Sequence, residues 1–151
     1  MALFTHILVP TDGARLSART VKAAIALAGA MGARVTALHV IPAYAPPVYM
    51  DGIIPQPELY SAADYKRSTQ AYADRVLAKV EEQARDAGVR YDKAFVTHDS
   101  PWSAIIRTAR SRKCDLIVMA SHGRRGMEAL LLGSETQKVL THSKVPVLVC
   151  R

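Results

Sequence analysis

The sequence has little cysteine, few aromatic residues and no long hydrophobic run. Its two cysteines, Cys114 and Cys150, offer no metal-ligand spacing and at most one disulfide, which favours a reducing compartment. No apolar run approaches the ~20 residues that a membrane-spanning helix needs. The first residues also lack the basic start and the long apolar core of a signal peptide. We therefore expect a cytoplasmic protein, neither secreted nor embedded in a membrane.

Aromatic residues make up 6% of the chain, and no predicted strand carries the interleaved aromatics on which single-strand-binding proteins stack bases. The formal net charge is +7, yet the basic residues are spread along the chain. Their densest cluster, between Arg107 and Lys113, has the spacing of a solvated helix side. We interpret the charge first as general surface charge and second as attraction for an anionic ligand or partner. Nucleic-acid binding is the least favoured interpretation.

Short apolar runs alternate with helical periods from one end of the chain to the other. Five segments are predicted as strands: residues 7–9, 34–41, 91–97, 115–119 and 145–150. Four segments are predicted as helices: residues 17–31, 62–87, one that opens at Ser100 and Pro101, and one from Ser134 to about Thr141. This alternation predicts one α/β domain over residues 1–151, with a Rossmann-like, doubly wound parallel sheet and helices on both faces. For this sheet we expect the strand order 3-2-1-4-5.

One glycine-containing loop joins the fourth predicted strand to the last predicted helix. It opens with Ala120, Ser121, His122 and Gly123, continues for nine residues, and closes with Gly133 and Ser134. Glycine lets backbone N–H groups approach a ligand, and a helix N-terminus attracts an anion, most often phosphate. The loop is therefore a candidate phosphate site with the Ser134 hydroxyl as an added donor. The Ser-x-x-Gln pattern of Ser134 and Gln137 predicts a capping box at the helix start. The alternative for Ser134 is a plain N-cap, and this role and phosphate binding can hold at once.

A second polar loop follows the first predicted strand, at Pro10, Thr11, Asp12 and Gly13. In the predicted strand order the first and fourth strands are neighbours, so both loops would line one crevice. Ligands bind in such crevices beyond the carboxyl ends of the strands. Asp12 could then accept hydrogen bonds from ribose hydroxyls or hold a nucleotide-bound metal. The alternative is an ordinary strand-to-helix turn.

Together these segments resemble the universal stress protein family over essentially the whole chain. The resemblance rests on residues 7–13 (ILVPTDG), 38–40 (LHV), 114–119 (CDLIVM), 121–126 (SHGRRG), 130–134 (LLLGS) and 145–149 (VPVLV). The nucleotide-binding branch of that family shows glycine, two residues, glycine, nine residues, glycine, and then Ser or Thr. This chain departs from the spacing only at Ala120, which stands where the first glycine belongs.

The resemblance implies that the chain binds ATP or AMP, with Mg²⁺ as a candidate companion, and acts as a stress-response sensor or regulator. It implies that adenine and ribose are surrounded by Pro10, Thr11, Asp12, Val40 and Met119. It implies that the phosphates are approached by Gly123, Gly133, Ser134, Glu135 and Thr136. A carboxylate at Glu135 would repel phosphate unless its side chain points away. Nucleotide binding would order residues 123–132 and the proline-rich residues 42–59.

Histidine has two different interpretations in this chain. His122 lies in the ligand loop, where a phosphate contact and a purely structural role are both open. His39 stands within an apolar strand and is predicted to be a hydrogen-bonded core residue. Cys114 and Cys150 are interpreted as small core residues.

Oligomeric state and catalysis complete the expectations. The final strand, between Val145 and Val149, is apolar and lies at an edge of the predicted sheet, and the resemblance implies that it pairs with its copy in a homodimer. The alternative is an edge covered by a loop or helix.

Gly123 is not followed by a Walker lysine, so we expect no dedicated enzyme, although slow ATP hydrolysis stays open. The remaining alternative is a nucleotide-independent homodimer of the same fold that binds a protein partner.

Overall fold

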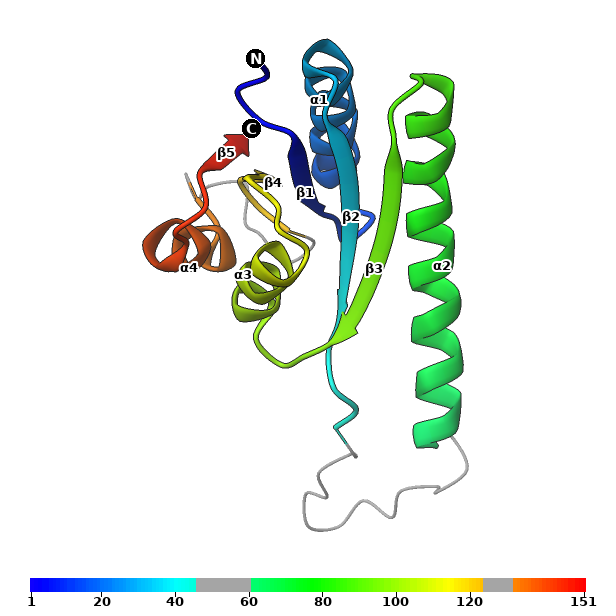
Figure 1. Ribbon diagram of the computed structural model, residues 1–151. Helices are drawn as coiled ribbons and strands as arrows, with labels where there is room; N and C mark the ends of the chain where they lie inside the picture. The colour runs from blue at the N-terminus through cyan, green and yellow to red at the C-terminus, as the bar shows by residue number, and fades with distance from the viewer. Residues whose placement is uncertain (46–60, 124–131) are drawn as a thin grey trace.

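The computed structural model describes residues 1–45, 61–123 and 132–151 (Figure 1). Its strands are β1 (His6–Pro10), β2 (Arg34–Ile41), β3 (Tyr91–Thr97), β4 (Leu116–Ala120) and β5 (Val147–Cys150). Its helices are α1 (Arg15–Met31), α2 (Ala62–Asp86), α3 (Pro101–Ser111) and α4 (Ser134–His142). The strands form one parallel sheet of order β3-β2-β1-β4-β5, which confirms the predicted fold class and strand order.

The sheet is covered on both faces, and side-chain alternation along β1 divides the core between them. Ile7 and Val9 pack in a cluster with buried residues of α1 and α2. Leu8, between them, packs on the opposite face with Ile105 of α3 and Val139 of α4. Burial on both faces explains why β1 and β4 are continuous apolar runs instead of alternating ones. In Figure 1 the sheet accordingly lies between α1 and α2 on one side and α3 and α4 on the other.

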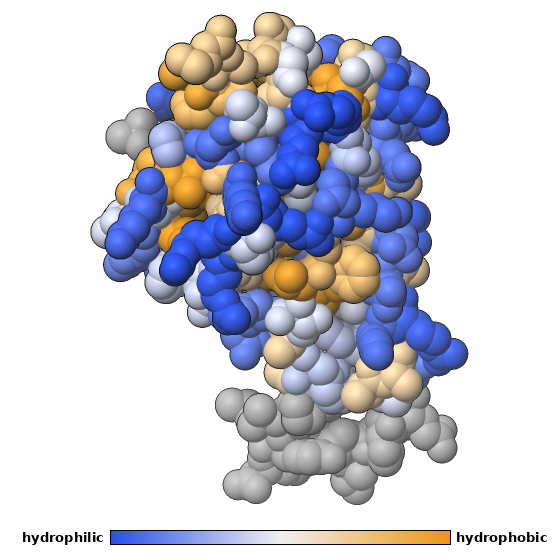
Figure 2. All heavy atoms as spheres, viewed as in Figure 1, coloured by the Kyte–Doolittle hydropathy of each residue, from blue (hydrophilic) through white to orange (hydrophobic). Residues whose placement is uncertain are grey.

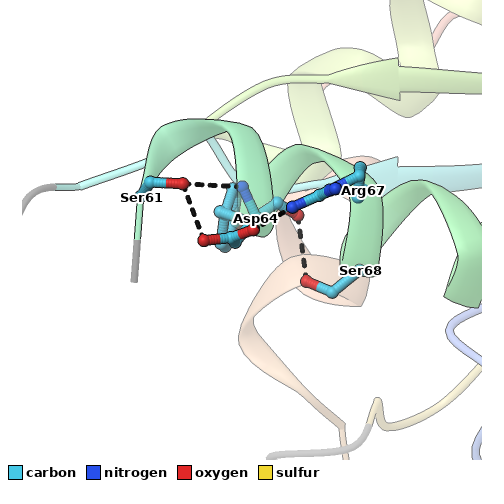
Figure 3. Close-up of polar contacts among 5 residues, drawn as sticks. Ser61, Asp64, Arg67 and Ser68 are labelled. Atoms are coloured by element: carbon cyan, nitrogen blue, oxygen red, sulfur yellow. Dashed lines mark hydrogen bonds and ion pairs between the residues drawn. The ribbon is translucent and has the colours of Figure 1, made fainter. Parts of the chain in front are cut away.

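The beginning of α2 is defined by a polar cap (Figure 3). Ser61 Oγ accepts a hydrogen bond from the backbone N–H of Asp64 at 3.1 Å and donates to Asp64 Oδ2 at 2.8 Å. Arg67 forms an ion pair with the same carboxylate. The hydrogen bond from Ser61 and the neighbouring Arg67 hold the pKa of Asp64 below its ordinary value. This cap determines where α2 starts and therefore which of its residues face the sheet.

Parallel pairing brings the carboxyl ends of β1, β2 and β4 to the same end of the sheet. Pro10 of β1 pairs with Leu38 of β2, and Ile7 of β1 pairs with Leu116 of β4. The loops after β1 and β4 therefore leave the sheet side by side, as the strand order predicts. Most of the glycine loop (residues 124–131) and of the proline-rich segment (residues 46–60) lies outside the described residues. Among the helices described, none has both the length and the apolar character needed to cross a bilayer.

Candidate functional site

The carboxylate of Asp12 is held in a defined orientation just beyond the end of β1. Its Oδ1 accepts hydrogen bonds from the backbone N–H of Ala14 at 2.9 Å and from Ser17 Oγ at 2.7 Å. Both donors belong to the start of α1, so the helix fixes one oxygen of the carboxylate. This leaves Oδ2 on the side of the loop that follows β4.

The main chain of the same loop is held by side chains from β2 and α2. His39 Nδ1 lies 2.9 Å from the carbonyl oxygen of Thr11, so the ring donates to it. The Tyr72 hydroxyl donates to the carbonyl of Asp12 at 2.7 Å, and its ring lies 5.5 Å from that of His39 between centroids. The predicted core role of His39 is thereby confirmed. Two contacting rings thus hold consecutive carbonyl groups of the loop.

Gly13 is the residue that lets Tyr72 come this close. Its φ of +79° is a conformation that residues with a Cβ rarely adopt. A Cβ built at this position would lie 2.6 Å from the Tyr72 hydroxyl and 2.8 Å from Val76 Cγ2. The turn after β1 therefore requires glycine for both its backbone conformation and its packing.

Gly123, the last described residue of the loop after β4, faces the carboxylate of Asp12. A Cβ at Gly123 would lie 3.0 Å from Asp12 Oδ2. The two residues are separated by more than a hundred positions in the chain, and the β1–β4 neighbourhood brings them together. The Asp12 carboxylate and the Gly123 backbone therefore lie side by side beyond the carboxyl ends of β1 and β4.

The far end of the glycine loop closes onto its beginning. The backbone N–H of Gly133 donates to the carbonyl of Ser121 at 2.7 Å, and Thr136 Oγ1 donates to the carbonyl of Ala120 at 2.9 Å. A Cβ at Gly133 would approach that Ser121 carbonyl to 3.0 Å, so this close approach needs glycine. Because the hydroxyl of buried Thr136 bonds Ala120, the structure does not direct this side chain toward the predicted phosphates.

The predicted capping box at the start of α4 is wrong. The N-cap is Gly133, without a side-chain cap, and Gln137 Nε2 donates instead to the carbonyl of Leu132 at 3.1 Å. The reason is that the tie from Gly133 to Ser121 starts the helix one residue earlier than the sequence pattern indicates. Ser134 is consequently the first helical residue, exposed, and its hydroxyl has no partner among the described residues. It adds a donor beside the unpaired N–H groups of the first turn.

The carboxylate of Glu135 points away from the glycine loop. Its Oε2 accepts a hydrogen bond from the backbone N–H of Trp102 at 2.8 Å, in the first turn of α3. Its Oε1 lies 3.5 Å from Lys138 Nζ. The negative charge is thus directed to the positive N-terminal end of another helix, where it is favourable. The structure therefore meets the condition under which Glu135 would not repel a phosphate.

His122 lies between the two halves of the site. Its Nδ1 is 3.0 Å from Ser121 Oγ. Its Nε2 is buried and has no hydrogen-bond partner among the described residues. A buried ring nitrogen without a partner is costly, and a bound polar ligand would reduce that cost.

The remaining predicted residues lie at the carboxyl ends of β1, β2 and β4. Pro10 ends β1, and Val40 is partly buried one position before the end of β2. Met119 and Ala120 are buried at the end of β4. Met119 and Val40 belong to the cluster under α3 and α4, so they are core residues at the carboxyl end of the sheet. Because Ala120 is buried, its methyl group adds little to the exposed surface.

Two contributors were missed by sequence reasoning. Tyr72 lies one helical turn before Val76 on the inner side of α2, but its hydroxyl reaches a loop sixty residues away. Ser17 was read only as the start of a helix, although its Oγ orients Asp12. Tyr72 carries a usable signal, a polar aromatic residue on an otherwise apolar stripe. Ser17 carries none.

Comparisons with known proteins identify the family of this chain and several similar proteins. The universal stress protein family matches residues 3–151. A universal stress protein of Thermus aquaticus is 34% identical over 150 residues, which cover 99% of this chain and 100% of the relative. The structure of the Methanocaldococcus jannaschii protein MJ0577 is similar at a TM-score of 0.78 and 26% identity, over 97% of this chain and 95% of that one. A universal stress protein in complex with cAMP is similar at a TM-score of 0.70 and 25% identity, over 100% and 98% of the two chains.

Proposed function

We propose that this chain, which belongs to the universal stress protein family, binds an adenine nucleotide at the carboxyl end of its sheet and acts as a stress-response sensor or regulator. The observation that carries the proposal is the meeting of Asp12 Oδ2 with the backbone of Gly123, 3.0 Å from a Cβ position there. Asp12 would accept from ribose hydroxyls or accompany Mg²⁺ bound to the phosphates. Because Ala14 and Ser17 hold Oδ1, the orientation of Oδ2 is already set before a ligand arrives.

The start of α4 is the proposed phosphate-binding end. The N–H of Gly133 already donates to Ser121, so the proposed donors are the exposed hydroxyl of Ser134 and the N–H groups of the first turn of α4. Such a helix start favours negative charge. The similar universal stress protein solved in complex with cAMP supports an adenine nucleotide as the ligand class.

Two features weaken the alternative of a nucleotide-independent interaction protein. That alternative rests on the Ala120 methyl group, which is buried, and on the Glu135 carboxylate, which bonds Trp102 at 2.8 Å. The Ala120 methyl group is thus part of the core, and the Glu135 charge is directed to α3 and not to the glycine loop. Nucleotide binding is therefore the function that the site supports better.

The test is to identify and then titrate the nucleotide. Freshly purified protein is denatured, any released nucleotide is identified by chromatography, and emptied protein is titrated with ATP, ADP, AMP and cAMP by calorimetry. We expect a micromolar Kd for at least one of them. Gly123→Val should weaken that binding by at least about 100-fold, or roughly 3 kcal/mol, because the new side chain fills the space beside Asp12.

Gly29→Ala is the matched control. A Cβ at this exposed α1 position meets Val89 at an ordinary 3.6 Å, so the substitution should leave both binding and unfolding nearly unchanged. Emptied protein that binds none of the four nucleotides would overturn the proposal. Equal nucleotide affinity of the wild type and Gly123→Val would mean that the nucleotide binds elsewhere on the protein.

We also propose a homodimer through β5. This strand ends the sheet, and Leu148 on it is 45% exposed, as is Leu140 of α4 at 43%. An apolar edge strand of this kind favours pairing with a second copy. Light scattering should give twice the chain mass at micromolar concentration, and Leu148→Glu should halve it. A wild-type monomer at that concentration would refute the dimer.

A further inference from the structure

The sheet has a second open edge, at β3, which the proposed function does not use. His98 donates its backbone N–H to Ile41 of β2, and the carbonyl of Arg90 accepts from Val35 of β2. Because main-chain groups alternate along a strand, those of Phe95 and Thr97 point away from β2. Their N–H groups have no hydrogen-bond partner in the described parts of the chain. This edge is therefore open to pairing with another strand.

A groove runs along this edge between β3 and α3. It consists of two adjoining hollows of about 460 and 320 Å³, which share Val96, Thr108 and Ser111. Ala94 and Val96 of β3 form its apolar floor, and Phe95 beside them is 44% exposed. Figure 2 shows this apolar surface in orange between α3 and β3, bordered by hydrophilic side chains. The groove thus combines an apolar floor with an open strand edge.

The charged side chains that line the groove are basic. Lys93 and Arg112 line one hollow and Arg107 lines the other, and none of the described lining residues is Asp or Glu. Lys93 lies 3.9 Å from Glu81 and Arg112 pairs with Asp92, but Arg107 forms no ion pair with a described residue. The chain as a whole carries +7. A second copy of this chain would bring the same positive charge, so an acidic occupant is favoured.

We propose that the groove between β3 and α3 docks an extended acidic segment of a partner protein, which adds as a strand to β3. The open main-chain groups of Phe95 and Thr97 would supply affinity, as in other cases of strand addition. Successive side chains of an added strand point to opposite faces of the sheet, so acidic side chains would lie on the α3 face near the Arg107 guanidinium and apolar ones on the other face beside Phe95. This surface lies at the opposite edge of the sheet from β5, so a homodimer through β5 leaves it accessible.

The experiment uses the full chain and a fluorescein-labelled peptide of about eight alternating Glu and Val residues. Fluorescence anisotropy measures its Kd, and amide NMR spectra locate it. We expect shifts at Phe95 and Thr97, and at least about ten-fold weaker binding of the matching Lys and Val peptide. Arg107→Glu should weaken the acidic peptide by about ten-fold or more. Arg110→Glu, the same charge change on α3 outside the groove lining, should weaken it by about two-fold or less.

Thr97→Pro tests strand addition separately. It removes an N–H that points away from β2, so pairing with β2 should survive, and proline is tolerated at such edge positions. We expect weaker peptide binding with nucleotide affinity unchanged. If circular dichroism shows that Thr97→Pro is unfolded, the comparison of Arg107→Glu with Arg110→Glu tests the proposal in its place. No binding of the acidic peptide at millimolar concentration, equal effects of Arg107→Glu and Arg110→Glu, or amide shifts confined to β5 would overturn the proposal. So would a single-stranded RNA that binds the groove where the peptide does not.

Discussion

The two ends of the sheet each carry an aspartate next to β1 and β4, and the two carboxylates have different surroundings. At the amino end, Asp115 Oδ2 accepts from the Thr5 N–H at 2.8 Å and from Thr5 Oγ1 at 2.7 Å, while its Oδ1 accepts from the His6 N–H at 2.9 Å. At the carboxyl end, Asp12 Oδ1 takes both donors from α1, and Oδ2 faces Gly123. Asp115 joins two strand starts through both oxygens, whereas Asp12 Oδ1 is held at the start of α1 and its Oδ2 lies beside Gly123.

The pKa of Asp115 agrees with a structural role. Partial burial alone would raise it, but the hydrogen bonds from His6 and Thr5 outweigh burial and hold the pKa below its ordinary value. The same residue type thus ties the sheet together at one end and, in our proposal, receives a ligand at the other. Residue type does not distinguish these roles; the position of each carboxylate, between two strand starts or beside the Gly123 backbone, does.

The largest effect on folding is expected at the carboxyl end, from Gly13→Ala. The substitution forces a positive φ on alanine and places its Cβ 2.6 Å from the Tyr72 hydroxyl, so we expect a loss of about 3 kcal/mol. Gly32→Ala is the control, because Gly32 has a similar φ of +67° but open space around it. It should cost only about 1 kcal/mol. Urea unfolding measures both, and equal losses would mean that the Tyr72 contact is unimportant.

Asp115→Ala should come next, at about 2 kcal/mol, because it leaves three donors at the amino end without their carboxylate. Nucleotide affinity should stay unchanged. Asp12→Ala should show the reverse pattern: a loss of about 1 kcal/mol in stability and at least about ten-fold weaker nucleotide binding. Calorimetric titration and urea unfolding of both variants make the comparison. Similar profiles for the two variants would remove the distinction between the ends of the sheet.

Tyr72→Phe should have a smaller effect, concentrated on binding. It keeps the ring against His39 and removes the hydrogen bond to the Asp12 carbonyl, so we expect about five-fold weaker nucleotide binding, or roughly 1 kcal/mol. Tyr65→Phe is the matched control on α2, since its hydroxyl donates to Pro42 at 2.7 Å, away from the β1 loop. Titration of both variants is the measurement. Equal losses in affinity would mean that neither hydroxyl acts through the loop.

These contacts also show what sequence can and cannot predict here. The parallel α/β sheet follows from the alternation of apolar runs and helices, and the expected strand order, which brings Asp12 and Gly123 together, is confirmed by the structure. The side-chain directions do not. Glu135 turns toward Trp102, 33 positions away, and Tyr72 reaches Asp12 across 60 positions. The capping box at Ser134 was wrong for the same reason, because a tertiary bond from Gly133 to Ser121 overrides the local pattern.

The smallest effect is expected from His6, at the amino end. Burial first, and the nearby Arg34 second, lower its pKa below the ordinary 6.5, although Asp115 opposes this. Below about pH 6.5 the unfolded chain therefore binds a proton that the folded chain does not, and stability falls as the pH drops toward the lowered folded pKa. Its Nε2 lies 2.8 Å from Thr36 Oγ1, so His6→Gln keeps a polar group there but cannot titrate. Unfolding free energies between pH 7.5 and 5.5 should decline less steeply for His6→Gln than for wild type, by at most about 1.4 kcal/mol per pH unit. Parallel curves would show that His6 does not contribute, and a steeper curve for the variant would reverse the sign of its contribution.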